Sequence, residues 1–291
     1  MVIVNILGGL GNQMFQYAIG KALALESNQA LKLDVTSFKD YVLRNYELNV
    51  FNIDCKIATE EEIKMLKYRK PNFFEKLHML IRKKSPPCSS FCRKEKYYYF
   101  DSEVLNRNEN TYLFGYWQSE KYFLEYKDIL MKEFTLKNNI STQSSKYQKL
   151  ITSQTSISLH IRRGDYITNK HTNTYHGTTS LSYYKKAVMI IKEKLDNPYF
   201  FMFSDDMDWV KNNFDFIENG IFVELPQNIP DYEEMYLMSI CKHNIIANSS
   251  FSWWGAWLNQ NPEKIIIAPK KWFNDSSIDT KDLIPDTWLR I

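Results

Sequence analysis

The sequence lacks the features that mark secreted, zinc-binding or nucleic-acid-binding proteins. Its 291 residues contain four cysteines, and only Cys88 and Cys92 lie close together, so no second pair completes a zinc framework or a disulfide scaffold. We therefore expect free thiols in a reducing compartment. The formal net charge of +3 is too small to indicate nucleic-acid binding, and no nucleic acid is expected as a partner.

Long apolar runs are also missing. The first residues lead directly into glycines, without the basic region and cleavage site of a signal peptide, and no run is long enough to span a bilayer. We expect a cytoplasmic protein. One window, residues 64–96, carries eleven Lys or Arg against two Glu, mixed with apolar side chains. Such a window forms either a solvated helical face or a peripheral contact with the cytoplasmic face of the inner membrane.

Strand and helix patterns alternate along much of the chain. Apolar runs at 2–6 and 31–34 predict buried strands, with a helix over 12–27 between them. In the second half, strands at 156–161, 199–203, 221–225, 244–247 and 264–268 alternate with helices at 182–195, 206–213, 231–241 and 251–258. The middle, 59–137, is predicted to be helix-rich and aromatic, and the polar stretch 138–155 is typical of a linker. The sequence thus predicts an α/β protein with two Rossmann-like domains, 1–150 and 151–291, facing a cleft that contains the site.

A polar motif, His-Ile-Arg-Arg-Gly-Asp at residues 160–165, follows one of these strands. Alternation along the strand puts His160 and Arg162 on one side. Guanidinium groups match phosphate oxygens, so arginine can take the role of a metal ion in stabilising a diphosphate leaving group. The alternative is a structural ion pair, for example Arg163 with Asp165.

Two further motifs lie at strand-to-helix turns. In Gly-Gly-Leu-Gly-Asn-Gln, residues 8–13, glycines let a ligand approach the backbone, and the following helix N-terminus favours an anion. Asn12 and Gln13 alternatively cap that helix. In Asn-Ser-Ser-Phe, residues 248–251, hydroxyls and free N–H groups predict a second phosphate cradle, with Ser249 as a helix cap in the structural alternative.

The pair Asp205-Asp206 follows the strand at 199–203. A carboxylate at a strand end accepts hydrogen bonds from a nucleotide base or ribose, or it binds a metal ion. No third ligand with metal-site spacing accompanies the pair, which makes it a weak indication of a metal.

Together these segments resemble the bacterial α-1,2-fucosyltransferases, glycosyltransferase family 11, over nearly the whole chain. The motifs that carry the resemblance lie at 8–18, 160–166 and 248–258. The resemblance implies a GT-B-like fold, inversion at the anomeric carbon, and GDP-β-L-fucose as donor, with no metal and no other cofactor. It also implies a galactose-containing glycan acceptor, free or lipid-linked, in O-antigen or capsule biosynthesis. Acceptor choice is expected to lie in the variable stretch 59–110.

The resemblance also assigns roles to residues. It implies that Arg162 holds the β-phosphate, that His160 lies by the nucleoside and that Asp205 binds guanine or ribose. The expected catalytic residues are Arg162, Asp165, His160 and Asn12, with Asp165 and His160 as candidate bases, Asn12 as a positioner and the choice among them left open. The expected donor-binding residues are Gly9, Gly11, Asn12, Gln13, His160, Arg162, Arg163, Asp205, Ser249, Ser250 and Phe251.

Three other functions compete with this interpretation. A lectin-like, non-catalytic module would bind sugars through its aromatic side chains but should not bind GDP. A dehydrogenase would use Asp34 at the second strand end, although the spacing of Gly8, Gly9 and Gly11 does not fit its fingerprint. A nucleic-acid binder would use the basic window at 64–96 and show a steep salt dependence.

Overall fold

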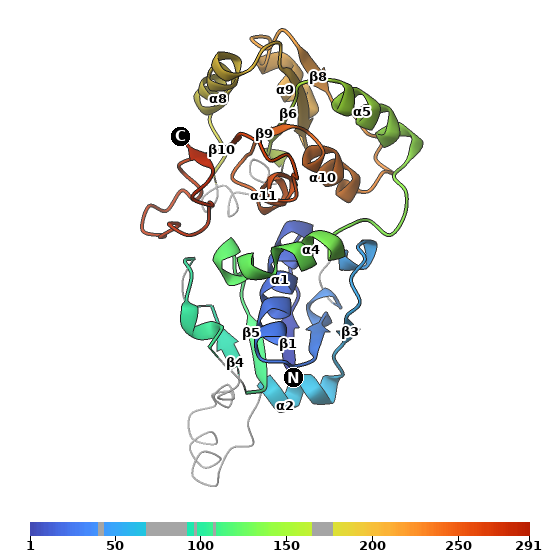
Figure 1. The fold of residues 1–291 in the computed structure, drawn as a ribbon, viewed down its shortest axis with the longest axis vertical. Helices are drawn as coiled ribbons and strands as arrows, with labels where there is room; N and C mark the ends of the chain where they lie inside the picture. The colour runs from blue at the N-terminus through green and yellow to red at the C-terminus, as the bar shows by residue number, and fades with distance from the viewer. Residues whose placement is uncertain (40–43, 68–91, 96–97, 107–108, 165–176) are drawn as a thin grey trace. The chain divides into compact units, whose positions relative to one another are not determined.

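The chain folds into two compact units, Met1–Lys137 and Asn138–Ile291 (Figure 1). Each unit is an α/β layer structure around its own parallel sheet. The structure, a computed structural model, describes residues 1–39, 44–67, 92–95, 98–106, 109–164 and 177–291.

The connection between the units differs from the sequence prediction. The stretch 138–155 is polar enough to resemble a linker, but Thr142–Ser153 form helix α5. Ser141 begins the helix, because its hydroxyl accepts a hydrogen bond from the Ser144 backbone N–H at 3.1 Å, and Ile151 is fully buried. Because α5 belongs to the second unit, the division falls at 137/138 rather than after residue 150.

The first unit contains a five-stranded parallel sheet in the order β3-β2-β1-β5-β4. The expected strands at 2–6 and 31–34 are confirmed, and Val2, Ile3 and Val4 are fully buried. Strands β3, β4 and β5 were not predicted. The elements are β1 (Val2–Asn5), α1 (Leu10–Glu26), β2 (Leu31–Asp34), β3 (Lys56–Ile57), α2 (Glu60–Lys67), β4 (Cys92–Lys94), β5 (Thr111–Phe114) and α4 (Lys127–Glu133).

Helix α1 packs on this sheet through a glycine. A Cβ at Gly20 would lie 2.9 Å from Leu31 Cδ1 and 3.0 Å from Val4 Cγ1. We expect Gly20→Val to lower the free energy of unfolding by about 1–3 kcal/mol, because the added methyls overpack the contact. Chemical denaturation of both proteins measures the difference. Met189→Val, at a helical residue that is 61% exposed, is the control and should change the free energy of unfolding by only about a few tenths of a kcal/mol. An equal loss of stability in both variants would contradict the packing argument.

The second unit contains a six-stranded parallel sheet in the order β11-β10-β9-β6-β7-β8. The five expected strands and four expected helices all form, with shifted ends except for the strand at 156–161, and β11 was not predicted. The elements besides α5 are β6 (Ser156–Ile161), α8 (Leu181–Lys194), β7 (Tyr199–Ser204), α9 (Met207–Asn213), β8 (Gly220–Phe222), α10 (Asp231–Ser239), β9 (His243–Ile245), α11 (Ser250–Trp257), β10 (Ile266–Ala268) and β11 (Leu289–Arg290).

Each sheet has a topological switch point beside its central strand. In the second unit β6 pairs with β7 on one side and with β9 on the other. In the first unit β1 pairs with β2 on one side and with β5 on the other. Ligands of open α/β sheets bind outside the carboxyl ends of the strands at such points. The fold therefore singles out the loops that follow β6, β9, β1 and β5.

The predicted membrane contact falls largely where the chain is not described. Of the basic window 64–96, residues 68–91 and 96 lie outside the described residues. Within the described part of the chain, no helix combines the length and the apolarity needed to cross a bilayer.

Candidate functional site

Three of the polar motifs meet at one edge of the second sheet. Arg162 follows β6, Asp205 follows β7, and the segment 248–250 follows β9. Because β6 lies between β7 and β9 and all three run parallel, their carboxyl ends are neighbours. The sequence predicted that each motif ends a strand, and the topology brings them together at the switch point.

Arg162 is held by a carboxylate. Its Nη1 lies 3.0 Å from Asp205 Oδ2, and the two side chains are 22% and 25% exposed. The other oxygen of Asp205 accepts a hydrogen bond from the Arg163 backbone N–H at 2.8 Å. Gly164 packs against the same carboxylate, since a Cβ there would lie 2.7 Å from Asp205 Oδ2. Asp205 therefore fixes both the Arg162 guanidinium and the backbone that follows β6.

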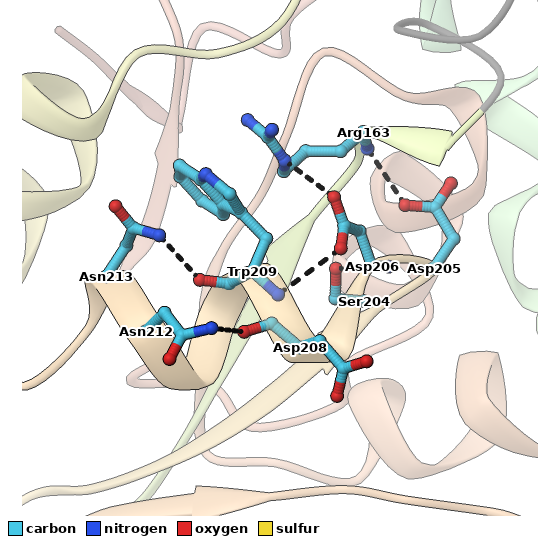
Figure 2. A network of polar contacts seen from close by, with 8 residues as sticks. All are labelled: Arg163, Ser204, Asp205, Asp206, Asp208, Trp209, Asn212 and Asn213. Atoms are coloured by element: carbon cyan, nitrogen blue, oxygen red, sulfur yellow. Dashed lines mark hydrogen bonds and ion pairs between the residues drawn. The ribbon is translucent and has the colours of Figure 1, made fainter.

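Arg163 has a different set of partners (Figure 2). Its Nε donates to Asp206 Oδ2 at 3.0 Å, and its guanidinium carbon lies 3.6 Å from the ring centroid of Trp209. Asp206 also caps α9 by accepting from the Trp209 backbone N–H. Such a cation–π contact and ion pair hold the side chain in a structural position. Asp165, predicted from the sequence as an alternative ion-pair partner of Arg163 and as a catalytic residue, lies outside the described residues.

His160, the penultimate residue of β6, is a buried imidazole. It is 4% exposed, and its Nδ1 has no hydrogen-bond partner among the described residues. Its ring centroid lies 6.0 Å from that of Phe251 in α11. Burial, and then the positive charge of Arg162, lower the pKa of His160 well below its ordinary value, although Asp205 opposes this. The ring is therefore neutral at neutral pH, with a buried nitrogen that a ligand can satisfy.

The segment after β9 is both a cap and an anchor. The Ser249 hydroxyl accepts from the Phe251 backbone N–H at 3.3 Å, so the predicted N-cap of α11 is confirmed. Asn248 donates from its Nδ2 to the Gly177 and Trp272 carbonyls. These contacts fix the start of α11, whose first N–H groups lack intrahelical acceptors and suit an anion. The Ser249 hydroxyl keeps its own proton as a donor.

Glu234 of α10 carries a perturbed carboxyl that the charges of this site influence, and the sequence did not single it out. Burial, then the negative charges of Asp231 and Asp205, raise the pKa of this carboxyl to about 8, while Arg162 lowers it. The Glu234 carboxyl therefore lies close enough to Arg162 and Asp205 for their charges to act on it. No sequence motif marks Glu234, because α10 has the pattern of an ordinary helix. Only the folded chain brings the residue near the charges of Arg162 and Asp205. A carboxyl in such an environment is typical of a functional site.

The neighbouring Glu233 has a structural role instead. It is 4% exposed and accepts hydrogen bonds from the backbone N–H and the hydroxyl of Ser141, the latter at 2.7 Å. These bonds attach the start of α5 to α10. The two adjacent glutamates of α10 therefore differ: Glu233 is engaged in packing, whereas Glu234 carries the perturbed carboxyl.

In the first unit the glycine-rich motif forms the turn from β1 into α1. Gly8 has φ of 79°, and Gly9 is the N-cap without any side-chain cap. Gln13 is buried: its Nε2 donates to the Gly8 and Asn45 carbonyls, and its Oε1 accepts from the Glu47 N–H. Gln13 therefore braces the loop and does not cap the helix. Asn12 instead accepts at its Oδ1 from Gln118 Nε2 at 2.8 Å.

The remaining predicted positions of this loop are backbone positions. Gly11 lies buried in the first turn of α1, and a Cβ at Gly9 would lie 3.9 Å from Arg44 Nε. Asp34, the residue a dehydrogenase would use, is fully buried and accepts hydrogen bonds from Thr36 and from the Tyr112 hydroxyl at 2.6 Å. Its carboxylate is therefore engaged within the protein. Among the described residues, no group of three His, Cys, Asp or Glu side chains is arranged to hold a metal ion.

Solved structures share the fold of this chain. POFUT1 in complex with GDP has a TM-score of 0.52 at 13% identity, over 92% of this chain and 97% of that one. NodZ α-1,6-fucosyltransferase co-crystallised with GDP has a TM-score of 0.50 at 15% identity, over 87% of this chain and 90% of that one. The predicted α/β, GT-B-like class is confirmed. The chain thus shares the GT-B-like fold of these two structures.

The family follows from the sequence. The chain matches glycosyl transferase family 11 over residues 1–291 and belongs to that family. It is 38% identical to an alpha-1,2-colitosyltransferase of Escherichia coli, over 100% of this chain and 99% of that protein. It is 36% identical to the O-antigen biosynthesis glycosyltransferase WbnK of Escherichia coli, over 98% of each. Galactoside alpha-(1,2)-fucosyltransferase 2 of Rattus norvegicus is 22% identical, over 89% of this chain and 67% of that protein.

Proposed function

We propose that this chain transfers L-fucose from GDP-β-L-fucose to the 2-hydroxyl of a galactose-containing glycan, with inversion to an α-1,2 linkage. The observation that carries the proposal is Arg162, held by Asp205 at the switch point of the second sheet, beside His160 and the start of α11. This edge offers a guanidinium, hydroxyls and helix N–H groups to a diphosphate. Membership of family 11 supports the reaction class.

The proposed chemistry is departure of GDP assisted by positive charge. Arg162 stabilises the negative charge that develops on the β-phosphate as the bond to fucose breaks, and the Ser249 and Ser250 hydroxyls donate to the same diphosphate. No metal ion is required in this scheme. The acceptor hydroxyl attacks the opposite face of an oxocarbenium-like sugar and loses its proton late, so a strong base is not needed. The lowered pKa of His160 favours nucleoside contact over proton abstraction for that residue.

Glu234 supplies the guanine contact in this proposal. The N1–H and N2–H groups of guanine are adjacent donors, and an ionised carboxylate accepts both. Asp205 already uses both oxygens on Arg162 and on the Arg163 N–H, whereas no intramolecular hydrogen bond holds the Glu234 carboxyl among the described residues. We therefore assign base recognition to Glu234 and the positioning of Arg162 to Asp205.

A second donor, GDP-colitose, is favoured by the 38% identity to an alpha-1,2-colitosyltransferase. Colitose is the 3-deoxy counterpart of L-fucose, so the two donors differ by one hydroxyl. A site that hydrogen-bonds this hydroxyl rejects the deoxy sugar by about 10⁴-fold or more, because its polar groups are left unpaired. A site shaped for the deoxy sugar rejects the extra hydroxyl by only about 10²-fold. The ratio of kcat/KM for the two donors therefore identifies the natural one.

The test is GDP release from each donor, with EDTA present, across a panel of β-galactosides. We expect release from GDP-fucose that depends on the acceptor, and an α-1,2 product by NMR. If GDP-colitose is the better donor and GDP-fucose trails it by about 10²-fold, the fucose assignment is replaced by colitose. No release from either donor, together with no GDP binding by calorimetry, would return the chain to the lectin-like alternative.

A further inference from the structure

The switch point of the first sheet contains a side-chain contact between its two loops. One loop, residues 8–13, follows β1, and the other, residues 115–118, follows β5, the strand paired beside β1. Gln118 Nε2 donates to Asn12 Oδ1 at 2.8 Å across this point. The two residues are half-buried and come from segments 106 positions apart in the chain. The contact lies where an open α/β sheet presents a ligand site.

This contact decides which end of the Asn12 amide is available. An asparagine amide has an acceptor end and a donor end, and its hydrogen-bond partners set which one points outward. The oxygen of Asn12 is taken by Gln118. The nitrogen lies beside Gly8, where a Cβ would come within 2.9 Å of it, and it has no acceptor among the described residues. Asn12 is therefore presented as a hydrogen-bond donor.

Glu95, which follows β4, holds the turn that carries Gln118. Its carboxylate accepts from the backbone N–H groups of Tyr116 at 2.6 Å and Trp117 at 2.9 Å. Gly115 leaves space for the Glu95 side chain, since a Cβ at Gly115 would clash with Glu95 Cβ. Burial raises the pKa of Glu95 to about 7, although the two N–H groups lower it. The turn is therefore held by the half-buried Glu95 carboxyl group.

Helix α1 holds the same turn from the other side. Gln16 donates from its Nε2 to the Gly115 carbonyl at 3.1 Å, and its Oε1 accepts from the Leu7 backbone N–H at 2.9 Å. Trp117 is 1% exposed and has φ of 56°, a left-handed conformation that costs a non-glycine residue energy. A strained, doubly braced turn that ends in one polar contact is typical of a preorganised site.

We propose that Gln118 is a positioning residue that turns the Asn12 amide so that its N–H group donates to an oxygen of the bound substrate, with Glu95 holding Gln118 in place. The inference rests on the proposed function and on the expectation, from the family resemblance, that Asn12 takes part in the reaction. It assigns Asn12 the role of a donor to an oxygen of the reacting sugar.

The test reverses the direction of the contact. In Gln118→Glu the carboxylate can only accept, so the Asn12 amide rotates to donate to it and presents its oxygen to the substrate. We expect kcat to fall by about 10²-fold, the scale for losing one preorganised donor, with the Kd for GDP unchanged. Gln118→Leu leaves the amide free to rotate and should lower kcat by about tenfold. Gln148→Glu is the matched control, because Gln148 is also half-buried and donates to one side chain, the Tyr236 hydroxyl, at 2.8 Å; its kcat should not change.

A double-mutant cycle separates positioning from a general loss of structure. Asn12→Asp keeps the shape and the acceptor oxygen but lacks the N–H group, so it should lose about as much kcat as Gln118→Glu. Adding Gln118→Leu to Asn12→Asp should then cost nothing further. Wild-type kcat in Gln118→Glu, or additive losses in the cycle, would overturn the positioning role while the proposed transfer reaction stands.

The contact between Gln118 and Asn12 can also be tested by NMR, without any substrate, in case the protein does not catalyse the proposed reaction. If wild-type protein turns over neither donor, the proposed function fails, and the contact is then judged by NMR of side-chain amides. Asn12→Leu should shift the Gln118 side-chain amide resonance, because its acceptor is removed. An unchanged resonance would overturn the inference.

Discussion

Replacing Arg162 with alanine is expected to lower kcat for acceptor-dependent GDP release by about 10²–10³-fold at saturating donor. The guanidinium is held 3.0 Å from Asp205 at the carboxyl end of β6, where the proposed diphosphate lies. Removing it takes away charge stabilisation that grows as GDP departs, so kcat falls more than donor binding weakens. Arg162→Lys should recover part of the rate, because lysine keeps the charge and loses the fork of donors.

The adjacent arginine provides the comparison. Arg163 is bound to Asp206 and stacked on Trp209 (Figure 2). We therefore expect Arg163→Ala to lower the melting temperature and to leave kcat close to that of the wild type. Measuring kcat, the Kd for GDP-fucose by calorimetry and the melting temperature for both variants separates the two roles. Near-wild-type kcat in Arg162→Ala with GDP-fucose bound would show that the leaving group is stabilised by other groups.

The affinity for GDP is expected to rise steeply with pH and to level off near pH 8. The pKa of Glu234 in the free protein is raised to about 8 by burial and by Asp231 and Asp205. Guanine binds to the ionised form in our proposal, so below pH 8 the carboxyl must lose a proton on binding. Each pH unit below 8 then costs about tenfold in Kd, and binding releases a proton. Calorimetry in buffers of different ionisation enthalpy measures both quantities.

The same carboxyl predicts a change in the stability of the free protein. Because its folded pKa lies above the ordinary value, the native state binds more protons than the unfolded state between about pH 4.5 and 8. Stability from this group is therefore present at low pH and is lost as the pH rises through 8. Glu234→Gln cannot ionise, so both its GDP affinity and its stability should lose this pH dependence.

The matched control is the neighbouring position on α10. Glu233→Gln removes a carboxylate that holds Ser141, so it should lower stability but keep the pH dependence of GDP binding. Inosine diphosphate, which lacks the N2 amino group, should bind less well than GDP to wild type and lose less affinity in Glu234→Gln. A GDP affinity that is flat from pH 6 to 8 in wild type would remove Glu234 from the base site.

The central strands of both sheets could be predicted because they are buried on both faces. β1 and β6 are buried at every position and were predicted as strands over 2–6 and 156–161. The strand at 31–34 also forms with the predicted bounds, although Leu31 and Lys32 are only half-buried. The edge strands β3 and β4 were missed for the opposite reason. They are two and three residues long, Lys-Ile and Cys-Arg-Lys, and short, charged edge strands carry no apolar pattern.

The linker prediction failed because composition does not reveal a cap. The stretch after Asn138 is rich in Ser, Thr and Gln, yet Ser141 caps α5 and Glu233 binds that cap from α10. Local sequence contains the capping residue but not its distant partner. Gln118 and Glu234 were missed on the same grounds, since each interacts with residues far away in the chain.

The sequence by itself determined the class of fold, the family and the strand ends at which polar residues lie, because buried strands, turn residues and motifs are local patterns. The tertiary structure decided how those polar residues divide their roles. It separated Arg162, paired with Asp205 at the switch point, from Arg163, stacked on Trp209. It also brought Gln118 to Asn12, and Glu234 within the influence of the Arg162 and Asp205 charges. Pairing, burial and charge coupling between distant segments exist only once parallel strands have set their order, so only the folded chain distinguishes a ligand-binding side chain from one that supports it.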